Sequence, residues 1–352
     1  MEIDKISEWL SYLGCVLVVF VEPLLCSIGF LLNCACVFVF ISVSNNAYFR
    51  KTSLLTYLVA LSICNGLQLL LSLFVIVLPA IEQFVSITSE DLMRNLLKIS
   101  SFSVRYGYPL LLTVNYAAIW LLTLICAQRF QAICHPSSPW KKRLSAIRNA
   151  RLAVIIVILL AIGLNIIRFW EFKYNEEDRV VTTELREHLL YKLIQEGVVY
   201  GMIVYGLPAG LLLWLNGNIL ALLKKDKPIA SSTRRDSETR AAHLTVCVFL
   251  FFFLCSTLSA SIRLFMIVAG DVVESWYWLV DLSNLLMNIF ALITPILCYI
   301  FTRGFKDLFF VIRQPKAKDA LVPYLEDVSD RRQSHLLLQN SSNSPHHTAQ
   351  LV

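Results

Sequence analysis

The chain has 352 residues, of which 57% are hydrophobic and only 16% are Asp, Glu, Lys or Arg, and its mean hydropathy is +0.64. An average soluble domain carries about 25% charged residues, so a soluble protein this apolar would lack the polar side chains to cover its surface. The composition argues against a soluble enzyme, a disordered protein and a secreted disulfide scaffold. The net charge of +6 is too small to suggest nucleic-acid binding.

Seven stretches are long and apolar enough to cross a bilayer, because a membrane-spanning helix needs about 20 mostly apolar residues. We expect them at residues 15–43, 54–78, 106–134, 152–172, 198–223, 244–268 and 279–301. Glu22 and Pro23 interrupt the first stretch, so its membrane part is expected to begin near Leu24. The sequence therefore predicts an all-α fold, a bundle of seven transmembrane helices within residues 15–301.

The distribution of Lys and Arg predicts which side of the membrane each loop faces. Eighteen of them follow the first, third, fifth and seventh stretches, whereas eight lie in the N-terminal segment and the remaining loops. Loops rich in Lys and Arg stay on the cytoplasmic side. We therefore expect residues 1–14 to be extracellular and the C-terminus to be cytoplasmic.

The segment after the seventh stretch changes character twice. Phe305, Leu308, Phe309 and Ile312 repeat at helical spacing, with charged residues opposite them. We expect residues 302–313 to form a short amphipathic helix in contact with membrane lipid on the inner leaflet. Residues 314–352 are rich in polar residues and are expected to form a disordered cytoplasmic tail.

The sequence offers no recognisable catalytic or metal-binding constellation. All ten cysteines lie inside or at the edge of the apolar stretches, where small buried side chains are the simplest interpretation. There is no nucleophile paired with a base, no cluster with metal-ligand spacing and no Gly-rich phosphate loop. We therefore expect no catalytic residue, no metal, no cofactor and no enzyme activity.

Several short motifs, in order along the chain, resemble those of rhodopsin-like G-protein-coupled receptors. The strongest closes the third stretch, where Gln128-Arg129-Phe130 takes the place of the family's acid-Arg-aromatic triplet and His135-Pro136 follows. The other matches are single residues or pairs at the family's helix positions: Asn33, Asn65, Pro208 and Thr294-Pro295. The resemblance covers about residues 15–313.

The resemblance implies roles for two sets of residues. The set expected to meet a heterotrimeric G protein is Gln128, Arg129, Phe130, His135 and Pro136. The set expected to form the switch in the core is Asn33, Asn65, Phe252, Thr294 and Pro295.

The chain also departs from the family pattern. Gln128 stands where the family has an acid, and an amide holds Arg129 less firmly than a carboxylate does, so we expect raised ligand-free activity. Asn65 leaves no carboxylate for the sodium ion that many family members hold. No cysteine stands at Val104, so the family's common bridge to the loop after the fourth span is absent.

Two stretches resemble invertebrate FMRFamide-type peptide receptors in particular. Arg168-Phe169-Trp170-Glu171 closes the fourth span, and Ser283-Asn284-Leu285-Leu286 lies early in the seventh. The same runs also suit interfacial aromatic and polar anchors. The residues expected to bind ligand in the outer half of the bundle are Tyr108, Leu111, Asn115, Arg168, Trp170, Glu171, Arg263, Asp281, Asn284 and Asn288.

Some of these side chains constrain the ligand. Leu111 is apolar where amine receptors place an Asp, which argues against an amine. Arg263 and Asp281 are costly in a membrane unless paired or hydrated, so they pair with each other, contact ligand or contact lipid headgroups. A peptide ending in Arg-Phe-amide would suit Asp281 and Glu171 through its guanidinium and Trp170 through its ring.

The resemblance therefore implies a plasma-membrane receptor that binds an extracellular amidated peptide and activates a heterotrimeric G protein. Two alternatives remain open: a multi-span transporter or channel, and a receptor-fold protein with a small-molecule ligand or without G-protein coupling. The lack of two matching halves argues against the transporter.

Overall fold

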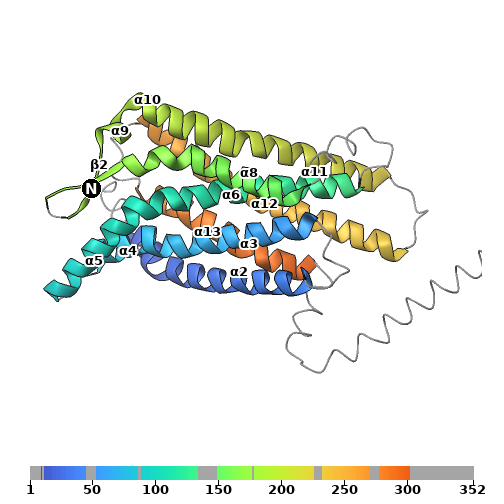
Figure 1. Ribbon diagram of the computed structural model, residues 1–352, viewed down its shortest axis with the longest axis horizontal. Coiled ribbons are helices and arrows are strands. Elements are labelled where there is room, and N and C mark those ends of the chain that lie inside the picture. The colour runs from blue at the N-terminus through green and yellow to red at the C-terminus, as the bar shows by residue number, and fades with distance from the viewer. Residues whose placement is uncertain are drawn as a thin grey trace, which may run out of the picture. The chain divides into compact units, whose positions relative to one another are not determined.

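Long helices make up almost all of the part of the chain that the structure, a computed structural model, describes (Figure 1). The described residues are residue 9 and residues 12–44, 53–85, 89–133, 149–176, 178–225, 232–269 and 277–301. They fall within one unit, Met1–Thr302. The helix expected at 302–313, the tail expected at 314–352 and most of the segment 1–14 lie outside the described residues.

The elements follow one another with only short connections. The π-helical segments are η1 (Leu17–Val21), η2 (Leu73–Val77), η3 (Ser103–Gly107) and η5 (Leu193–Gly206), and η4 (Ile166–Trp170) is a 3-10 helix. The two strands are β1 (Phe172–Tyr174) and β2 (Val180–Thr182). The α-helices are α2 (Glu22–Ser44), α3 (Ser53–Ser72), α4 (Leu78–Phe84), α5 (Glu90–Phe102), α6 (Tyr108–Ile133), α8 (Ala150–Asn165), α9 (Glu184–Glu187), α10 (Leu189–Lys192), α11 (Leu207–Lys225), α12 (Ser232–Ala269) and α13 (Tyr277–Phe301).

Seven helical segments are long and apolar enough to cross a membrane, which confirms the predicted bundle. They are Tyr12–Ile41, Leu54–Phe84, Glu90–Gln131, Ala150–Trp170, Leu189–Leu222, Thr245–Phe265 and Trp278–Leu297. The second, third and fifth extend further than the apolar stretches indicated. Backbone hydrogen bonding continues a helix past its apolar part, as the polar helix α5 does before α6.

The prediction that the first span begins near Leu24 was wrong. Helix continues through Glu22 and Pro23, and the π-helical turn η1 lies immediately before them, with the N–H of Glu22 bonded to the carbonyl of Leu17. Pro lacks an N–H and clashes with the carbonyl four residues earlier in a regular α-helix. The wider π turn relieves that clash, so Glu22 lies inside the bundle and is fully buried.

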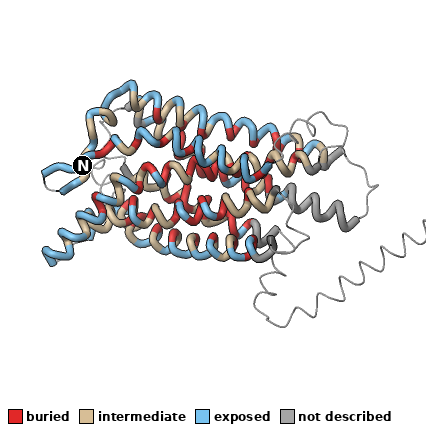
Figure 2. The backbone as a smooth tube through the Cα atoms, in the orientation of Figure 1, coloured by how far each residue is buried: buried red, intermediate tan, exposed pale blue. Residues whose placement is uncertain are grey.

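The core runs along the middle of the bundle, whereas the outer faces of the helices are apolar and exposed (Figure 2). Tyr57, Tyr116, Leu212 and Phe252 are fully buried and belong to one cluster that joins α3, α6, α11 and α12. Helix α8 is the opposite case, because apolar residues such as Leu159 are more than half exposed. Exposed apolar faces on a ring of helices are expected to contact lipid tails.

A small β-hairpin closes one end of the bundle (Figure 1). Strands β1 and β2 are antiparallel, with Lys173 opposite Val181. The guanidinium of Arg105 lies 4.6 Å from the ring centre of Tyr174, and the rings of Tyr108 and Phe172 meet edge to face at 5.7 Å. These contacts, which we call the hairpin clasp, fasten β1 to the third span where the resembling family commonly has a disulfide.

Candidate functional site

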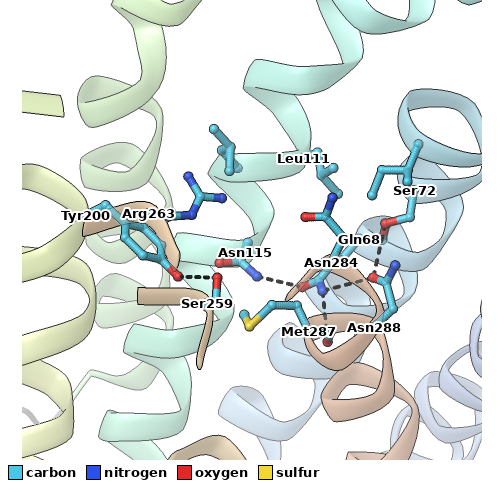
Figure 3. A pocket seen from close by; sticks show the side chains of 12 residues that line it. Gln68, Ser72, Leu111, Asn115, Tyr200, Ser259, Arg263, Asn284, Met287 and Asn288 are labelled. Atoms are coloured by element: carbon cyan, nitrogen blue, oxygen red, sulfur yellow. Dashed lines mark hydrogen bonds between the residues drawn. The ribbon is translucent and has the colours of Figure 1, made fainter. Parts of the chain in front are cut away.

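A small pocket lies among the spans in the half of the bundle nearer the hairpin (Figure 3). Five of the ten predicted ligand residues line it: Leu111, Asn115, Arg263, Asn284 and Asn288. Its other lining residues were not among those ten, and they include Gln68, Ser72, Tyr200, Ser259 and Met287. The centres of water-sized molecules have about 30 Å³ available, so the pocket has the size of a few waters or one small terminal group.

A chain of side-chain amides forms one wall of the pocket (Figure 3). Asn115 donates through Nδ2 to Oε1 of Gln68 at 3.2 Å. Gln68 in turn donates through Nε2 to Oδ1 of Asn288 at 3.3 Å and to the carbonyl of Met287 at 3.2 Å. Ser72 donates to the same Asn288 oxygen at 3.1 Å. The network joins α3, α6 and α13, and mutual bonding holds its members in fixed orientations.

The amide network ends on a carboxyl group in the first span. Asn288 donates through Nδ2 to Oε1 of Glu22 at 2.6 Å, and Glu22 is fully buried. Sequence reasoning missed this contact because it placed Glu22 outside the membrane. The first span is therefore tied to the pocket by a polar bond as well as by packing.

A charged cluster forms the opposite wall, and we define it as Arg168, Glu171, Glu196 and Arg263. Nη1 of Arg168 lies 3.1 Å from Oε1 of Glu171 and 2.8 Å from Oε1 of Glu196. Nη1 of Arg263 lies 2.8 Å from the second oxygen of Glu196. Glu196 thus bridges two arginines, which lie at the end of the fourth span and in the sixth.

Further bonds fix the charged cluster in place. Arg168 donates through Nη2 to the hydroxyl of Tyr116 at 3.2 Å, and Glu171 accepts from Tyr191 at 2.7 Å and from Arg186 at 3.3 Å. The guanidinium of Arg263 lies 4.3 Å from the ring centre of Tyr200. Buried charges are tolerated only when paired in this way.

The structure resolves the alternatives for Arg263 in favour of a partner that the sequence did not single out. Arg263 pairs with Glu196 and not with Asp281, whose Oδ2 lies 3.4 Å from the position that a Cβ would take at Gly14. Glu196 had been assigned to a charged loop, because it precedes the apolar stretch 198–223. The polar start of the helical segment Leu189–Leu222 could have indicated it.

The remaining predicted ligand residues lie around the pocket rather than in its wall. Tyr108 packs on Phe172 of the hairpin, Trp170 is 63% exposed, and Asp281 is half-buried near the first span. Arg168 and Glu171 lie behind Arg263 in the charged cluster, and both are buried. Since Glu171 already accepts bonds from three side chains, it supports the site and is not open to a ligand guanidinium.

Comparison with known proteins identifies the architecture. Residues 32–300 match the model of the family described as 7 transmembrane receptor (rhodopsin family). The chain belongs to this family. As a rhodopsin-family receptor it is a multi-pass membrane protein, and the family is one of receptors and not of enzymes.

Two curated relatives are similar to this receptor. One is the FMRFamide peptide receptor frpr-18 of Caenorhabditis elegans, 25% identical over 287 residues, which are 76% of this chain and 63% of the relative. The other is the FMRFamide receptor of Drosophila melanogaster, 23% identical over 265 residues, which are 69% of this chain and 46% of the relative. The receptor thus spans between about half and two thirds of the length of these relatives.

The receptor's predicted switch residues lie in the middle of the bundle. Asn33 is buried and donates through Nδ2 to the carbonyls of Gly29 at 2.9 Å and Ala291 at 3.2 Å. Pro295 lies inside α13 and cannot donate to residue 291, so Asn33 pairs with the carbonyl that the proline leaves without a helix partner. Phe252 is fully buried and meets Phe290 edge to face at 5.8 Å, and Thr294 donates to the carbonyl of Phe290 at 3.0 Å.

The receptor's predicted coupling residues are described only in part. Gln128, Arg129 and Phe130 lie on the last turns of α6, and Phe130 is buried with its ring 5.5 Å from Trp214. His135 and Pro136 lie outside the described residues. The described part of this set is at the end of the bundle away from the hairpin, as coupling inside the cell requires if the hairpin is outside.

Proposed function

We propose that this rhodopsin-family receptor lies in the plasma membrane, binds an extracellular amidated peptide at the hairpin end and activates a heterotrimeric G protein at the opposite end. The observation that carries the proposal is the pocket wall of side-chain amides opposite Arg263. An amide group both donates and accepts hydrogen bonds, so this wall is suited to a peptide's terminal carboxamide. The relatives' names, which both contain FMRFamide, support the same ligand class.

The charge distribution supports the proposed orientation. Eighteen Lys and Arg residues lie on the side of the first loop and the C-terminal segment, against eight on the other side, and the richer side stays in the cytoplasm. The hairpin and the pocket then face outward, and Arg129 faces inward.

The proposed binding mode inserts only the end of the peptide into the pocket. The pocket has the size of a few waters, so it takes the terminal carboxamide, while the last aromatic ring stays above it near Tyr108 and Trp170. The half-buried Asp281 is the carboxylate left for a ligand guanidinium, since Glu171 is bonded within the charged cluster.

In this proposal, binding shifts the equilibrium between two packings of the bundle. Arg263 connects the pocket to the sixth span, and the amide network connects it to α3, α6 and α13. A ligand that bonds both walls would change how these helices pack at the inner end, where Gln128, Arg129 and Phe130 lie. Residues 135–148 and 226–231 complete the proposed G-protein surface together with the membrane lipid around it.

The experiment that tests this function applies a panel of amidated Arg-Phe peptides to cells that express the chain, with second messengers and ion flux recorded together. We expect a messenger response that Arg129→Ala abolishes without reducing surface expression. Ion flux without a messenger response would favour the transporter alternative. No response to any peptide at normal surface expression would favour a small-molecule ligand or a receptor that does not couple.

A further inference from the structure

The pocket contains a single type of charge among the residues that line it, and the protein itself compensates that charge. Arg263 is the charged lining residue, and its side chain is 22% exposed. Its Nη1 bonds Oε2 of Glu196 at 2.8 Å, and the Glu196 side chain is 21% exposed. Glu196 does not line the pocket, so it acts on a ligand through Arg263.

The charged cluster as a whole is neutral. Its two arginines, Arg168 and Arg263, are matched by its two carboxylates, Glu171 and Glu196. Arg186 also reaches Glu171, but its side chain is 35% exposed, so solvent screens it. A ligand group in the pocket therefore meets donor N–H groups without a net positive charge behind them.

We infer that Glu196 is a specificity-determining residue, which makes the pocket prefer a peptide with a neutral C-terminal carboxamide over the same peptide with a free carboxylate. This inference rests on the proposed function and adds a cause for its ligand class. A carboxylate that enters the pocket loses its hydration and gains no net opposite charge in return. It also approaches Glu196, whose negative charge repels it.

The hydrogen-bonding groups of the pocket favour the carboxamide for a second reason. In Figure 3 the Nδ2 of Asn115 points toward Gln68, and its carbonyl oxygen points toward the side of Tyr200 and Arg263. A carboxamide can accept from Arg263 and donate to Asn115 at the same time. A carboxylate has only acceptor oxygens, so it leaves the Asn115 oxygen without a donor.

Matched peptide pairs test the inference. Each amidated Arg-Phe peptide and its free-acid form are applied to the wild type, Glu196→Gln, Arg263→Gln and the double variant, and the ratio of free-acid to amide EC50 is measured. Glu196→Gln leaves Arg263 partly uncompensated and should lower the ratio by about tenfold, which corresponds to one modest charge interaction. Arg263→Gln should raise the ratio, and the double variant should return it to within about threefold of the wild type.

A control variant separates local from general charge effects. Glu184→Gln removes one negative charge from an exposed position on α9, outside the pocket, and should leave the ratio unchanged. Surface expression of each variant is measured with an epitope tag. If Glu196→Gln does not reach the surface, the rise in Arg263→Gln and its reversal in the double variant decide the question.

An unchanged ratio in all variants, with amidated peptides still active on the wild type, would overturn the role of Glu196 and leave the proposed function standing. A wild type that reaches the surface but answers neither form of any peptide would overturn both.

Discussion

Two buried polar regions of this receptor are built differently. In the charged cluster and the amide network, most side chains bond one another, and Arg168 alone reaches Glu171, Glu196 and Tyr116. In the middle of the bundle, Asn65 is fully buried, and neither its Nδ2 nor its Oδ1 has a hydrogen-bond partner among the described residues. The hairpin-end region is self-sufficient in hydrogen bonds, whereas Asn65 is not.

The difference indicates which polar residues stabilise the fold. Removing one partner from a satisfied buried network leaves the others unpaired and costs free energy, whereas removing an unpaired buried group costs little. The hairpin end therefore has preorganised polar groups, as a ligand site needs. Asn65 occupies a place where the resembling family has an acid, and the described protein groups give it no bonded role.

The largest expected effect comes from the charged cluster. Arg168→Met leaves Glu171 and Glu196 buried with less compensation, and we expect a loss of about 3–5 kcal/mol in stability, the usual cost of breaking a buried ion pair. Thermal unfolding of the detergent-solubilised receptor measures it. As a control, Lys98→Met removes an exposed pair with Asp178, 3.6 Å long, and should cost less than about 0.5 kcal/mol. Equal effects in the two variants would show that the cluster is not a stabilising unit.

A second pair of variants compares the two regions directly. Gln68→Leu removes a residue that bonds Asn115, Asn288 and the carbonyl of Met287, so we expect a loss of about 2–3 kcal/mol. Asn65→Leu has nearly the same volume and breaks no bond between described residues, so it should change stability by less than about 0.5 kcal/mol. The comparison fails if Asn65→Leu is the more harmful change.

A smaller effect is expected in the hairpin clasp. Tyr174→Leu removes the ring that lies 4.6 Å from Arg105, and we expect a loss of about 1 kcal/mol in hairpin protection. Hydrogen exchange of residues 172–182 measures it, with Lys173→Leu, on the other face of β1, as the control. Because the clasp is not covalent, thiol reductants should leave peptide potency unchanged. A tenfold loss of potency in reductant would contradict this account of the clasp.

The smallest expected effect lies at the inner end. Gln128→Glu places a carboxylate beside Arg129 and should lower ligand-free signalling by a few-fold, because a charge-assisted bond holds the arginine more firmly. Basal messenger levels at equal surface expression measure it, with Gln131→Glu as a matched change on the same turn. Unchanged basal activity in Gln128→Glu would remove the expected role of this glutamine.

The sequence predicted the seven spans and half of the ligand residues, because apolar length and helix position carry that information. It could not predict the continuation of helix through Pro23, since the relieving π turn at η1 has no composition of its own. It also could not choose the partner of Arg263. The choice of Glu196 over Asp281 depends on how far the fifth span extends beyond its apolar part, and only the packed helices determine that.

The account's central claim is that an extracellular peptide places its amidated end in the pocket at the hairpin end. Photo-crosslinking on intact cells tests it most directly, with an amidated Arg-Phe peptide that carries a benzophenone on its last ring. The account predicts crosslinks confined to the outer parts of the spans around Tyr108, Asn115 and Tyr200, and their loss when unlabelled peptide is added. Competable crosslinks elsewhere in the chain, or none that unlabelled peptide displaces, would contradict it.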